Sequence, residues 1–335
     1  MKNLLYIGNK LSRHGVTPTT IETLGPLLEF EGFNVVYSSS QKNQILRLVA
    51  MLFCVLKNSK VDAVLIDTYS TTNFWYAFLV SQLCRLLRLK YIPILHGGNL
   101  SSRLRTNPKL CGMVFNNSYQ NVAPSLFLME KFTDMGYQNL IHISNSIELQ
   151  NYPFLERNEA KCNLLWVRSF AQIYNPIMAV EVFSLLKKKY PNATLCMVGP
   201  DKDGSLYEAK TRAKELNVEV EFPGKLSKKD WITMSKEYSI FINTTHFDNM
   251  PVSVMEAMSL GLAIVSTNVG GVPFLLKDEK NALLVPDGNV NEMAYAIFRL
   301  IEDPDFFKSI VKNARDKAKE FEWDEVKLKW IAILK

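Results

Sequence analysis

Short apolar runs alternate with amphipathic stretches along the whole chain. In the first half this pattern predicts strands at 4–8, 33–39, 63–68 and 91–97, with helices at 19–32, 41–58 and 73–89 between them. In the second half it predicts strands at 163–169, 194–200, 218–224, 239–245 and 262–268, with helices at 175–190 and 205–216. Strands that are apolar along their full length are typical of parallel sheets covered by helices on both faces.

The length of the chain divides this pattern into two domains. A chain of 335 residues is longer than one hydrophobic core usually organises. The stretch 145–157 is polar and contains a proline, so we expect the junction there. The predicted fold class is therefore α/β, with two Rossmann-like domains facing a cleft, at 1–150 and 151–320, followed by a tail at 321–335.

Candidate site residues lie directly after predicted strands. Open parallel sheets bind their ligands outside the carboxyl ends of the strands. By this rule five residues are expected to face one crevice: Gly15, His96, Arg168, Lys225 and Asp248.

The segment "DNMPVSVMEAM" at 248–258 places one acid in a polar loop and a second acid among apolar residues. We expect a helix to start across 249–252, with Asp248 as its cap and Pro251 in its first turn. The amides at the start of such a helix can bind an anion. Eight residues of helix rise roughly 12 Å, so Asp248 and Glu256 could hold the two ends of one extended ligand. The alternative is structural: Asp248 caps the helix and Glu256 pairs with a lysine.

The stretch 248–273 resembles the signature of the family-4 glycosyltransferases of the GT-B fold, in which two acids flank seven residues. The usual first acid is glutamate, and this chain has aspartate. The resemblance extends over nearly the whole chain and includes "EFPGK" at 221–225, "NALLVPDGN" at 281–289 and "FEWDEVKLKWIAIL" at 321–334. It implies an acceptor-side domain at 1–150, a nucleotide-sugar domain at 151–320 and a last helix, 321–335, that crosses back to the first domain.

The resemblance also implies roles for individual residues. Glu256 would bind the donor ribose, Asp248 would bind the transferred sugar, and Arg168 would neutralise the donor diphosphate. His96 would close on the sugar, and these four form the expected catalytic set. The remaining expected donor-binding residues are Gly15, Lys225, Asn249, Met250, Pro251 and Val252. Members of the family usually retain anomeric configuration and need no metal.

Two features depart from the family pattern. A lysine usually follows the arginine and completes a clamp of two cations, whereas "RSFAQIYNP" at 168–176 offers Tyr174 and Asn175. Lys225 or Arg103 would have to replace that cation. The first loop, at 8–17, also lacks the usual pair of adjacent glycines. Both departures concern the affinity for the donor more than the type of reaction.

Composition and charge narrow the setting of the protein. The five scattered cysteines favour a reducing compartment over disulfides or a zinc site. The longest apolar run, at 48–56, is too short to span a bilayer. Residues 1–150 carry 14 Lys+Arg against 8 Asp+Glu, which accounts for the whole net charge of +6. An anionic membrane surface is one partner for this half, through the apolar and basic stretch 44–60, and the alternative is a helix buried against the sheet.

The sequence thus predicts a retaining glycosyltransferase that moves a sugar from a nucleotide-diphosphate sugar to a glycan or lipid-linked acceptor, in the synthesis of polysaccharides or cell-surface glycans. We expect it in the cytoplasm or at the inner face of the cell membrane, with no cofactor, metal or nucleic acid. Two alternatives remain: a sugar-nucleotide epimerase of the same fold, and a catalytically inactive protein that binds sugar nucleotides.

Overall fold

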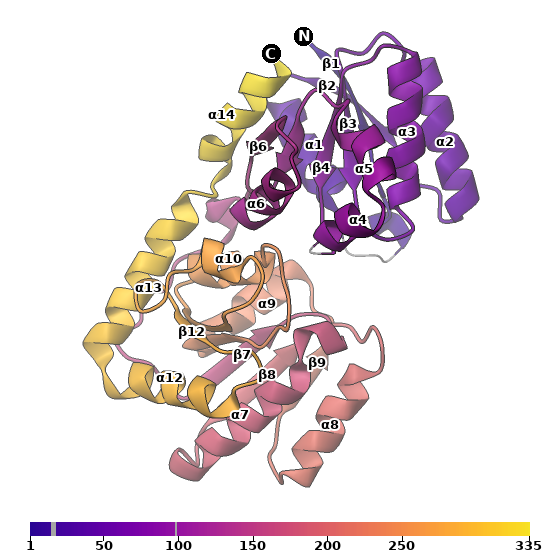
Figure 1. Ribbon diagram of the computed structural model, residues 1–335. Coiled ribbons are helices and arrows are strands. Elements are labelled where there is room, and N and C mark those ends of the chain that lie inside the picture. The colour runs from indigo at the N-terminus through magenta and orange to yellow at the C-terminus, as the bar shows by residue number, and fades with distance from the viewer. Residues whose placement is uncertain (15–17, 98) are drawn as a thin grey trace. The chain divides into compact units, whose positions relative to one another are not determined.

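A computed structural model describes residues 1–14, 18–97 and 99–335, so the predicted site residue Gly15 lies outside the described residues (Figure 1). The chain divides into two compact units. Unit 1 consists of Met1–Ser146 and Trp323–Lys335, and unit 2 consists of Ile147–Glu322. Each unit contains a parallel six-stranded sheet flanked by helices, which confirms the predicted α/β fold class.

The sheet of unit 1 has the strand order β2-β1-β3-β4-β5-β6, and all its pairs are parallel. Because the order reverses between β1 and β3, the carboxyl ends of these two strands form the switch point where such sheets bind ligands. The strands are β1 (Asn3–Ile7), β2 (Asn34–Ser38), β3 (Ala63–Thr68), β4 (Tyr91–Leu95), β5 (Asn121–Ala123) and β6 (Leu140–His142).

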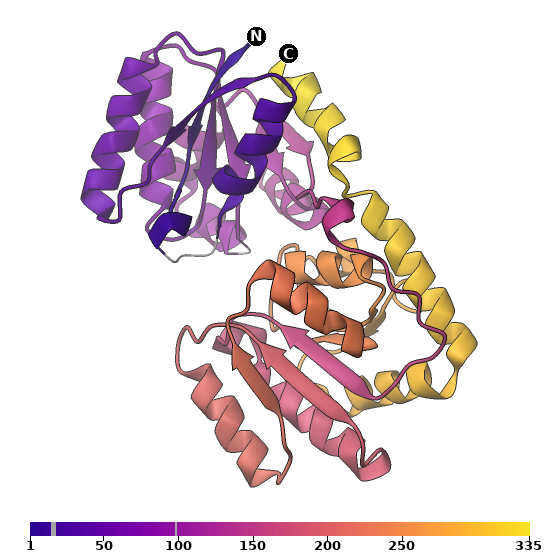
Figure 2. The same ribbon diagram turned by 180° about the vertical axis from the view of Figure 1, so that it is seen from behind.

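Helices cover both faces of this sheet, because alternate strand residues point to opposite sides. Leu4 and Tyr6 of β1 pack with the helices of one face, while Leu5 and Ile7 pack with those of the other. The first face carries α1 (Thr20–Phe30) and α14 (Trp323–Leu334), and the second carries α2 (Gln44–Lys57) and α3 (Phe74–Leu86) (Figure 2). The unit also contains α4 (Leu100–Thr106), α5 (Pro108–Phe115) and α6 (Leu126–Asp134).

The sheet of unit 2 has the order β12-β11-β10-β7-β8-β9, again with parallel pairs. The first three strands of this unit, β7, β8 and β9, form one half of the sheet, and the last three, β10, β11 and β12, form the other half. The switch point therefore lies between β7 and β10. The strands are β7 (Asn163–Val167), β8 (Thr194–Val198), β9 (Glu221–Gly224), β10 (Ile240–Asn243), β11 (Ala263–Thr267) and β12 (Leu283–Val285).

The second sheet has one hydrophobic core on each of its two faces. Leu164 and Trp166 of β7 belong to the core under α7 (Pro176–Lys189), α8 (Ser205–Glu215) and α12 (Val290–Glu302). Leu165, between them, belongs to the core under α9 (Lys228–Met234) and α10 (Val252–Ser259). The short α11 (Val272–Leu275) joins this second core, and α13 (Pro304–Lys319) contributes to both. Within the described part of the chain, no helix is long and apolar enough to span a bilayer.

Candidate functional site

The switch point of unit 2 brings together two of the predicted site residues. Arg168 directly follows β7, and Asp248 lies in the loop after β10. Their side chains form an ion pair in which the arginine is 16% exposed and the aspartate 13% exposed. Because this pair occupies the edge where parallel sheets bind ligands, an entering anion would compete with Asp248 for the guanidinium.

The helix that follows Asp248 begins later than the sequence indicated. α10 starts at Val252, Pro251 is its N-cap with an extended backbone, and no side chain caps it. The predicted helix start across 249–252 and the cap role of Asp248 were therefore wrong. The proline stops the helix from reaching back to Asn249, and Asp248 is left in the loop, where it pairs with Arg168.

The loop that carries Asp248 and Asn249 rests on closely packed glycines. The amide of Gly271 donates to the Asp248 carbonyl over 2.8 Å. A Cβ at Gly271 would lie 1.8 Å from the Asn249 carbonyl oxygen. On the other side of the site, a Cβ at Gly199 would lie 1.7 Å from the Arg168 carbonyl oxygen. The backbone around Asp248 and the backbone of Arg168 are thus packed so closely against Gly271 and Gly199 that neither glycine could carry a side chain without a shift.

The second acid, Glu256, is buried on α10 and has polar partners. Its carboxylate is 2.7 Å from the Tyr152 hydroxyl, which donates to it, and 2.5 Å from Lys228 Nζ. Burial raises the pKa of Tyr152, and the charge of Glu256 raises it further, so the phenol stays a donor. Pairing of Glu256 with a lysine, the structural alternative named from the sequence, is therefore present in unit 2.

The guanidinium of Arg168 is shielded from solvent and contacts an aromatic ring. Burial lowers the pKa of Arg168, and the nearby Tyr174 and the charge of Glu256 raise it in part. The guanidinium carbon lies 4.2 Å from the centre of the Tyr174 ring. Tyr174 thus lies against the Arg168 guanidinium, and Asn175 caps α7 by accepting from the Met178 amide over 3.3 Å.

The other predicted residues of unit 2 differ in exposure. Asn249 and Met250 are 8% and 9% exposed, and Val252 is 38% exposed at the start of α10. Lys225 directly follows β9 and is exposed. Among the cations considered as substitutes for the clamp lysine, Arg103 lies in unit 1, where it donates to the Ser70 carbonyl over 2.7 Å.

In unit 1, His96 directly follows β4 and is 9% exposed. Its Nε2 lies 2.9 Å from Oδ1 of Asp67, and the Tyr6 hydroxyl donates to the same oxygen over 3.1 Å. A carboxylate accepts hydrogen bonds, so this contact places a proton on Nε2. The ring of Tyr69 stacks on the imidazole with 4.8 Å between their centres. His96 is thus oriented by an acid and an aromatic ring.

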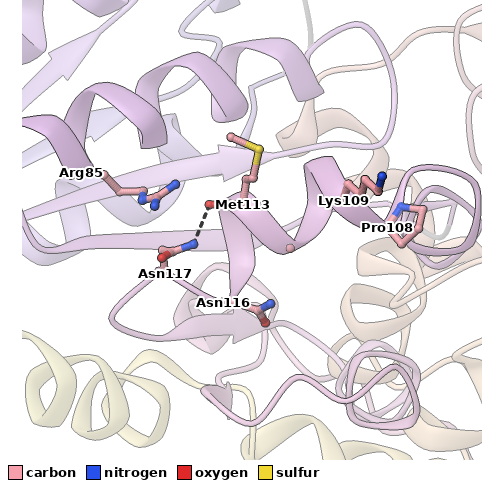
Figure 3. A pocket seen from close by; sticks show the side chains of 7 residues that line it. Arg85, Pro108, Lys109, Met113, Asn116 and Asn117 are labelled. Carbon is pink, nitrogen blue, oxygen red and sulfur yellow. Dashed lines mark hydrogen bonds between the residues drawn. The ribbon is translucent and has the colours of Figure 1, made fainter.

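An open depression on the surface of unit 1 is separate from these residues (Figure 3). Among its lining residues, the Asn117 side chain donates to the Met113 carbonyl over 3.2 Å. The lining of this depression combines two cations with amides and apolar atoms, and it includes no acid or nucleophile. Its lining residues are Arg85, Pro108, Lys109, Gly112, Met113, Asn116 and Asn117.

The Asp-x-Asp pattern at 201–203 forms a turn. Asp203 accepts from the Gln172 amide over 2.9 Å, and Asp201 accepts from the Gly204 amide over 3.1 Å. The hydrogen bonds that Asp203 accepts, first from the Ser205 hydroxyl and then from the Gln172 amide, lower the pKa of Asp203. Among the described residues no cluster of three or more His, Cys, Asp or Glu side chains has a geometry that could hold a metal ion.

Three polar partners of the predicted residues were missed from the sequence: Lys228 and Tyr152 in unit 2, and Asp67 in unit 1. Lys228 follows the N-cap Ser227 in the first turn of α9, and Tyr152 lies in the expected domain junction, so neither follows a strand directly. Asp67 is the next-to-last residue of β3, and the carboxyl-end rule that selected His96 would also have selected it.

Comparison with solved structures identifies the class of fold. The structure of Anabaena Alr3699/HepE in complex with UDP and glucose matches with a TM-score of 0.79 and 16% identity, covering 100% of this chain and 99% of that chain. Sucrose-phosphate synthase from Thermosynechococcus elongatus matches with a TM-score of 0.80 and 15% identity, covering 99% of this chain and 98% of that one. These similarities establish the GT-B fold.

The sequence of unit 2 is similar to that of known glycosyltransferases. Residues 152–317, just under half of the chain, match the family described as glycosyl transferases group 1. The poly(glycerol-phosphate) alpha-glucosyltransferase of Bacillus subtilis is 26% identical over 162 residues, which are 46% of this chain and 23% of that protein. The GalNAc-alpha-(1->4)-GalNAc-alpha-(1->3)-diNAcBac-PP-undecaprenol alpha-1,4-N-acetyl-D-galactosaminyltransferase of Campylobacter jejuni is 23% identical over 163 residues, 48% of this chain and 44% of that protein. The matched part of this chain spans less than half of either relative.

Proposed function

We propose that this glycosyltransferase is a retaining enzyme that moves a sugar from a nucleotide-diphosphate sugar to a glycan or lipid-linked acceptor. The observation that carries the proposal is the Arg168–Asp248 ion pair, whose side chains are 16% and 13% exposed, at the switch point of unit 2, with the charge of the buried Glu256 acting on the arginine. The structural neighbour with bound UDP and glucose supports a nucleotide-sugar donor. The relative that acts on an undecaprenol-linked glycan supports a lipid-linked acceptor.

The proposed reaction is electrostatic in nature. The bond between the anomeric carbon and the diphosphate oxygen breaks, and a bond from the acceptor oxygen to that carbon forms on the same face. The proton of the acceptor hydroxyl passes to the leaving phosphate. Negative charge grows on the diphosphate in the transition state, and Arg168 stabilises it in a poorly hydrated site. Following the family resemblance, no residue acts as a nucleophile and no metal takes part.

Each acid has a separate task in this proposal. Asp248 releases Arg168 to the diphosphate and binds hydroxyls of the transferred sugar. Glu256 accepts hydrogen bonds from the ribose hydroxyls while Tyr152 and Lys228 hold its carboxylate. His96, oriented by Asp67, contributes from unit 1 as a ligand of the sugar. Lys225 follows β9, where the family's loop meets the nucleotide base.

A two-stage assay tests the proposed function. Thermal shifts with UDP-, GDP- and ADP-sugars identify the donor, because a ligand that binds the folded state raises the melting temperature. The purified protein is then incubated with that donor and an undecaprenyl-linked glycan in the presence of EDTA. We expect transfer with retained anomeric configuration, and we expect Arg168→Ala to lower kcat by about 100-fold. Arg212→Ala, which removes a guanidinium from an exposed ion pair of α8, serves as the control.

Other outcomes would contradict the proposal. Isomerisation of the donor in the absence of acceptor would identify an epimerase. An unchanged glycan level in cells that carry Glu256→Ala would indicate an inactive binding protein. An inverted linkage in the product would disprove the retaining mechanism while leaving the class of enzyme intact.

A further inference from the structure

Helix α2 of unit 1 has two apolar faces, and the sheet covers one of them. Met51 and Val55, at most 1% exposed, pack against the sheet. The opposite face carries five large hydrophobic residues that are 53% to 73% exposed: Ile45, Leu46, Val49, Phe53 and Leu56. At about 100° per residue, these five occupy an arc of about 100° on the side away from the sheet. The helix is therefore buried against the sheet and yet apolar toward the solvent.

The neighbouring helix α3 continues this surface. Trp75, Leu79 and Leu86 are 45%, 37% and 80% exposed and recur at intervals of four and seven residues, so they form one stripe. Helices α2 and α3 lie side by side on the same face of the sheet (Figure 1, Figure 2). We call the eight residues of the two stripes the α2–α3 outer face. They are eight of the 21 exposed large hydrophobic residues among the described residues.

The charges around the α2–α3 outer face are almost all positive. Residues 32–129 contain ten Lys or Arg and two acids, Asp62 and Asp67, a difference of +8. Asp67 is buried against His96, and Arg47 is buried with its guanidinium bonded to backbone carbonyls, so neither contributes to the surface charge. Exposed cations lie before α2, after α2 and at the end of α3: Lys42, Lys57, Lys60, Arg85 and Arg88. An apolar stripe bordered by cations is the arrangement with which a helix lies in the interface of an anionic membrane.

We infer that the α2–α3 outer face docks on an anionic lipid surface, with the apolar side chains between the acyl chains and the lysines and arginines among the headgroups. The charge pattern selects this occupant over a second copy of the chain. In a twofold dimer the same surface meets itself, so two positively charged rims would face each other. A lipid surface instead supplies the opposite charge, and long cationic side chains reach headgroups while their stems stay apolar.

This inference goes beyond the proposed function, because membrane binding requires neither donor nor acceptor. Vesicle binding is measured without a sugar nucleotide, so its failure would leave the transfer reaction standing. Failure of the transfer assay would likewise leave the docking surface standing. If both hold, a lipid-linked acceptor would meet the enzyme at the surface where its lipid part resides.

Co-sedimentation of the full chain with vesicles tests the docking surface. Vesicles of equal parts phosphatidylcholine and phosphatidylglycerol are compared with vesicles of phosphatidylcholine alone. We expect the full chain to bind the mixed vesicles at least about tenfold more tightly, and we expect high salt to weaken that binding by screening the charges. Lys57→Glu with Lys60→Glu should weaken binding to the mixed vesicles by about fivefold for each lysine lost.

Substitution of an exposed apolar residue tests whether apolar side chains, in addition to the cations, contribute to vesicle binding. Phe53→Glu should lower binding to the mixed vesicles at least about tenfold. Tyr207→Glu on α8 of unit 2 introduces the same charge at a residue that is 75% exposed, compared with 64% for Phe53, and should bind as the unchanged chain does. Ile45→Gln, at the start of α2, provides a second variant if Phe53→Glu fails to fold. The melting temperature verifies folding in each case.

Three results would overturn the inference: equal binding to both kinds of vesicle, unchanged binding of Phe53→Glu, or no binding by the full chain. A dimer of the full chain in solution that Phe53→Glu converts to a monomer, without vesicle binding by either, would assign the α2–α3 outer face to a second copy.

Discussion

Glu256 is a buried carboxylate, and its neighbours determine which of its two oxygens can accept hydrogen bonds from a ligand. Tyr152 donates to Oε1 of the carboxylate, and Lys228 Nζ lies 2.5 Å from the same atom. The second carboxylate oxygen is therefore the one available for ribose hydroxyls in the proposed complex. Lys228 acts through Glu256 in this arrangement, as a positioning residue, and its own side chain is 60% exposed.

Substitution of Lys228 by methionine tests this positioning role. Lys228→Met keeps the length of the side chain and removes the charge that offsets a buried carboxylate. We expect the KM for the donor to rise about tenfold, a factor that corresponds to about 1.4 kcal/mol, with kcat nearly unchanged. Lys228→Arg should restore most of the affinity, and Lys229→Met on the same helix turn serves as the control. Steady-state kinetics that showed an equal fall in kcat would instead place Lys228 in the chemical step.

A similar arrangement orients His96 in unit 1. Asp67 accepts from both Tyr6 and the imidazole, and burial followed by the charge of Asp67 raises the pKa of Tyr6. A Cβ at Gly8 would lie 2.5 Å from Oδ2 of Asp67, so the chain also needs a glycine there. The carboxyl-end rule could have selected Asp67, but its pairing with Tyr6 and His96 could not be predicted from the sequence, because it depends on side-chain contacts between strands far apart in the chain.

At the scale of elements, the loop that carries Asp248 depends on close backbone contacts. Gly271→Ala is the sharpest test, because φ at this position is −86° and alanine can adopt that backbone conformation. The cost is steric: the added carbon would lie 1.8 Å from the Asn249 carbonyl oxygen. We expect the substitution to destabilise the protein by about 1–3 kcal/mol and to lower transfer activity through displacement of Asp248.

Chemical denaturation measures this effect against a matched control. At Gly112, inside α5, a Cβ would meet only the Asn116 side chain at 3.4 Å. Gly112→Ala should therefore leave activity unchanged and stabilise the protein by up to about 1 kcal/mol through better helix propensity. Equal stability of the two alanine variants would show that the loop at Asn249 can move without cost.

The hydrophobic pattern predicted many of the longer elements, although it missed α12 and α13, which have 13 and 16 residues. The strand predicted at 63–68 is Ala63–Thr68, and the helix predicted at 175–190 is Pro176–Lys189. Most of the other strands were predicted one to three residues too long at one or both ends, as at 239–245, because polar residues at strand ends also suit an extended chain. The strand predicted at 4–8 is displaced by one residue from Asn3–Ile7. β5, β6 and β12, of three residues each, were not predicted, since three residues show no alternation.

The helix start near Asp248 shows the limit of local signals. An aspartate three residues before a proline fits a capped helix, and the sequence pattern favoured that interpretation. The structure instead places an extended backbone at Pro251 and pairs Asp248 with Arg168, 80 residues earlier in the chain. An ion pair across two strands outweighed a local cap here, and a cap rule contains no information about such a partner.

At the scale of the whole molecule, the alternation of strands and helices was sufficient for the fold class, because parallel sheets need apolar strands and crossover helices. The chain leaves unit 1 at Ser146 and returns to it at Trp323. Thus α14, although last in sequence, belongs to the core of the first unit. Trp323, Val326, Trp330, Ile333 and Leu334 are buried against the side of the sheet that carries Leu4 and Tyr6.

This return of the chain makes the stability of unit 1 depend on its last helix. Trp330 is 3% exposed, and Trp330→Ala should remove about 3–5 kcal/mol from the free energy of unfolding of unit 1, because a large aromatic side chain leaves a cavity. Leu328→Ala, on the same helix at 60% exposure, should change it by less than about 0.5 kcal/mol.

Hydrogen exchange measured residue by residue distinguishes the two units. Amides of β1 and β3, which belong to the sheet under α14, should lose protection in Trp330→Ala, while amides of β7 and β10 in unit 2 should keep it. Local openings differ in free energy across a structure, so a defect in one cooperative unit appears first in that unit. Equal loss of protection in both sheets would mean that the units unfold together. Unchanged protection in β1 would mean that α14 contributes little to the core in which its tryptophan is buried.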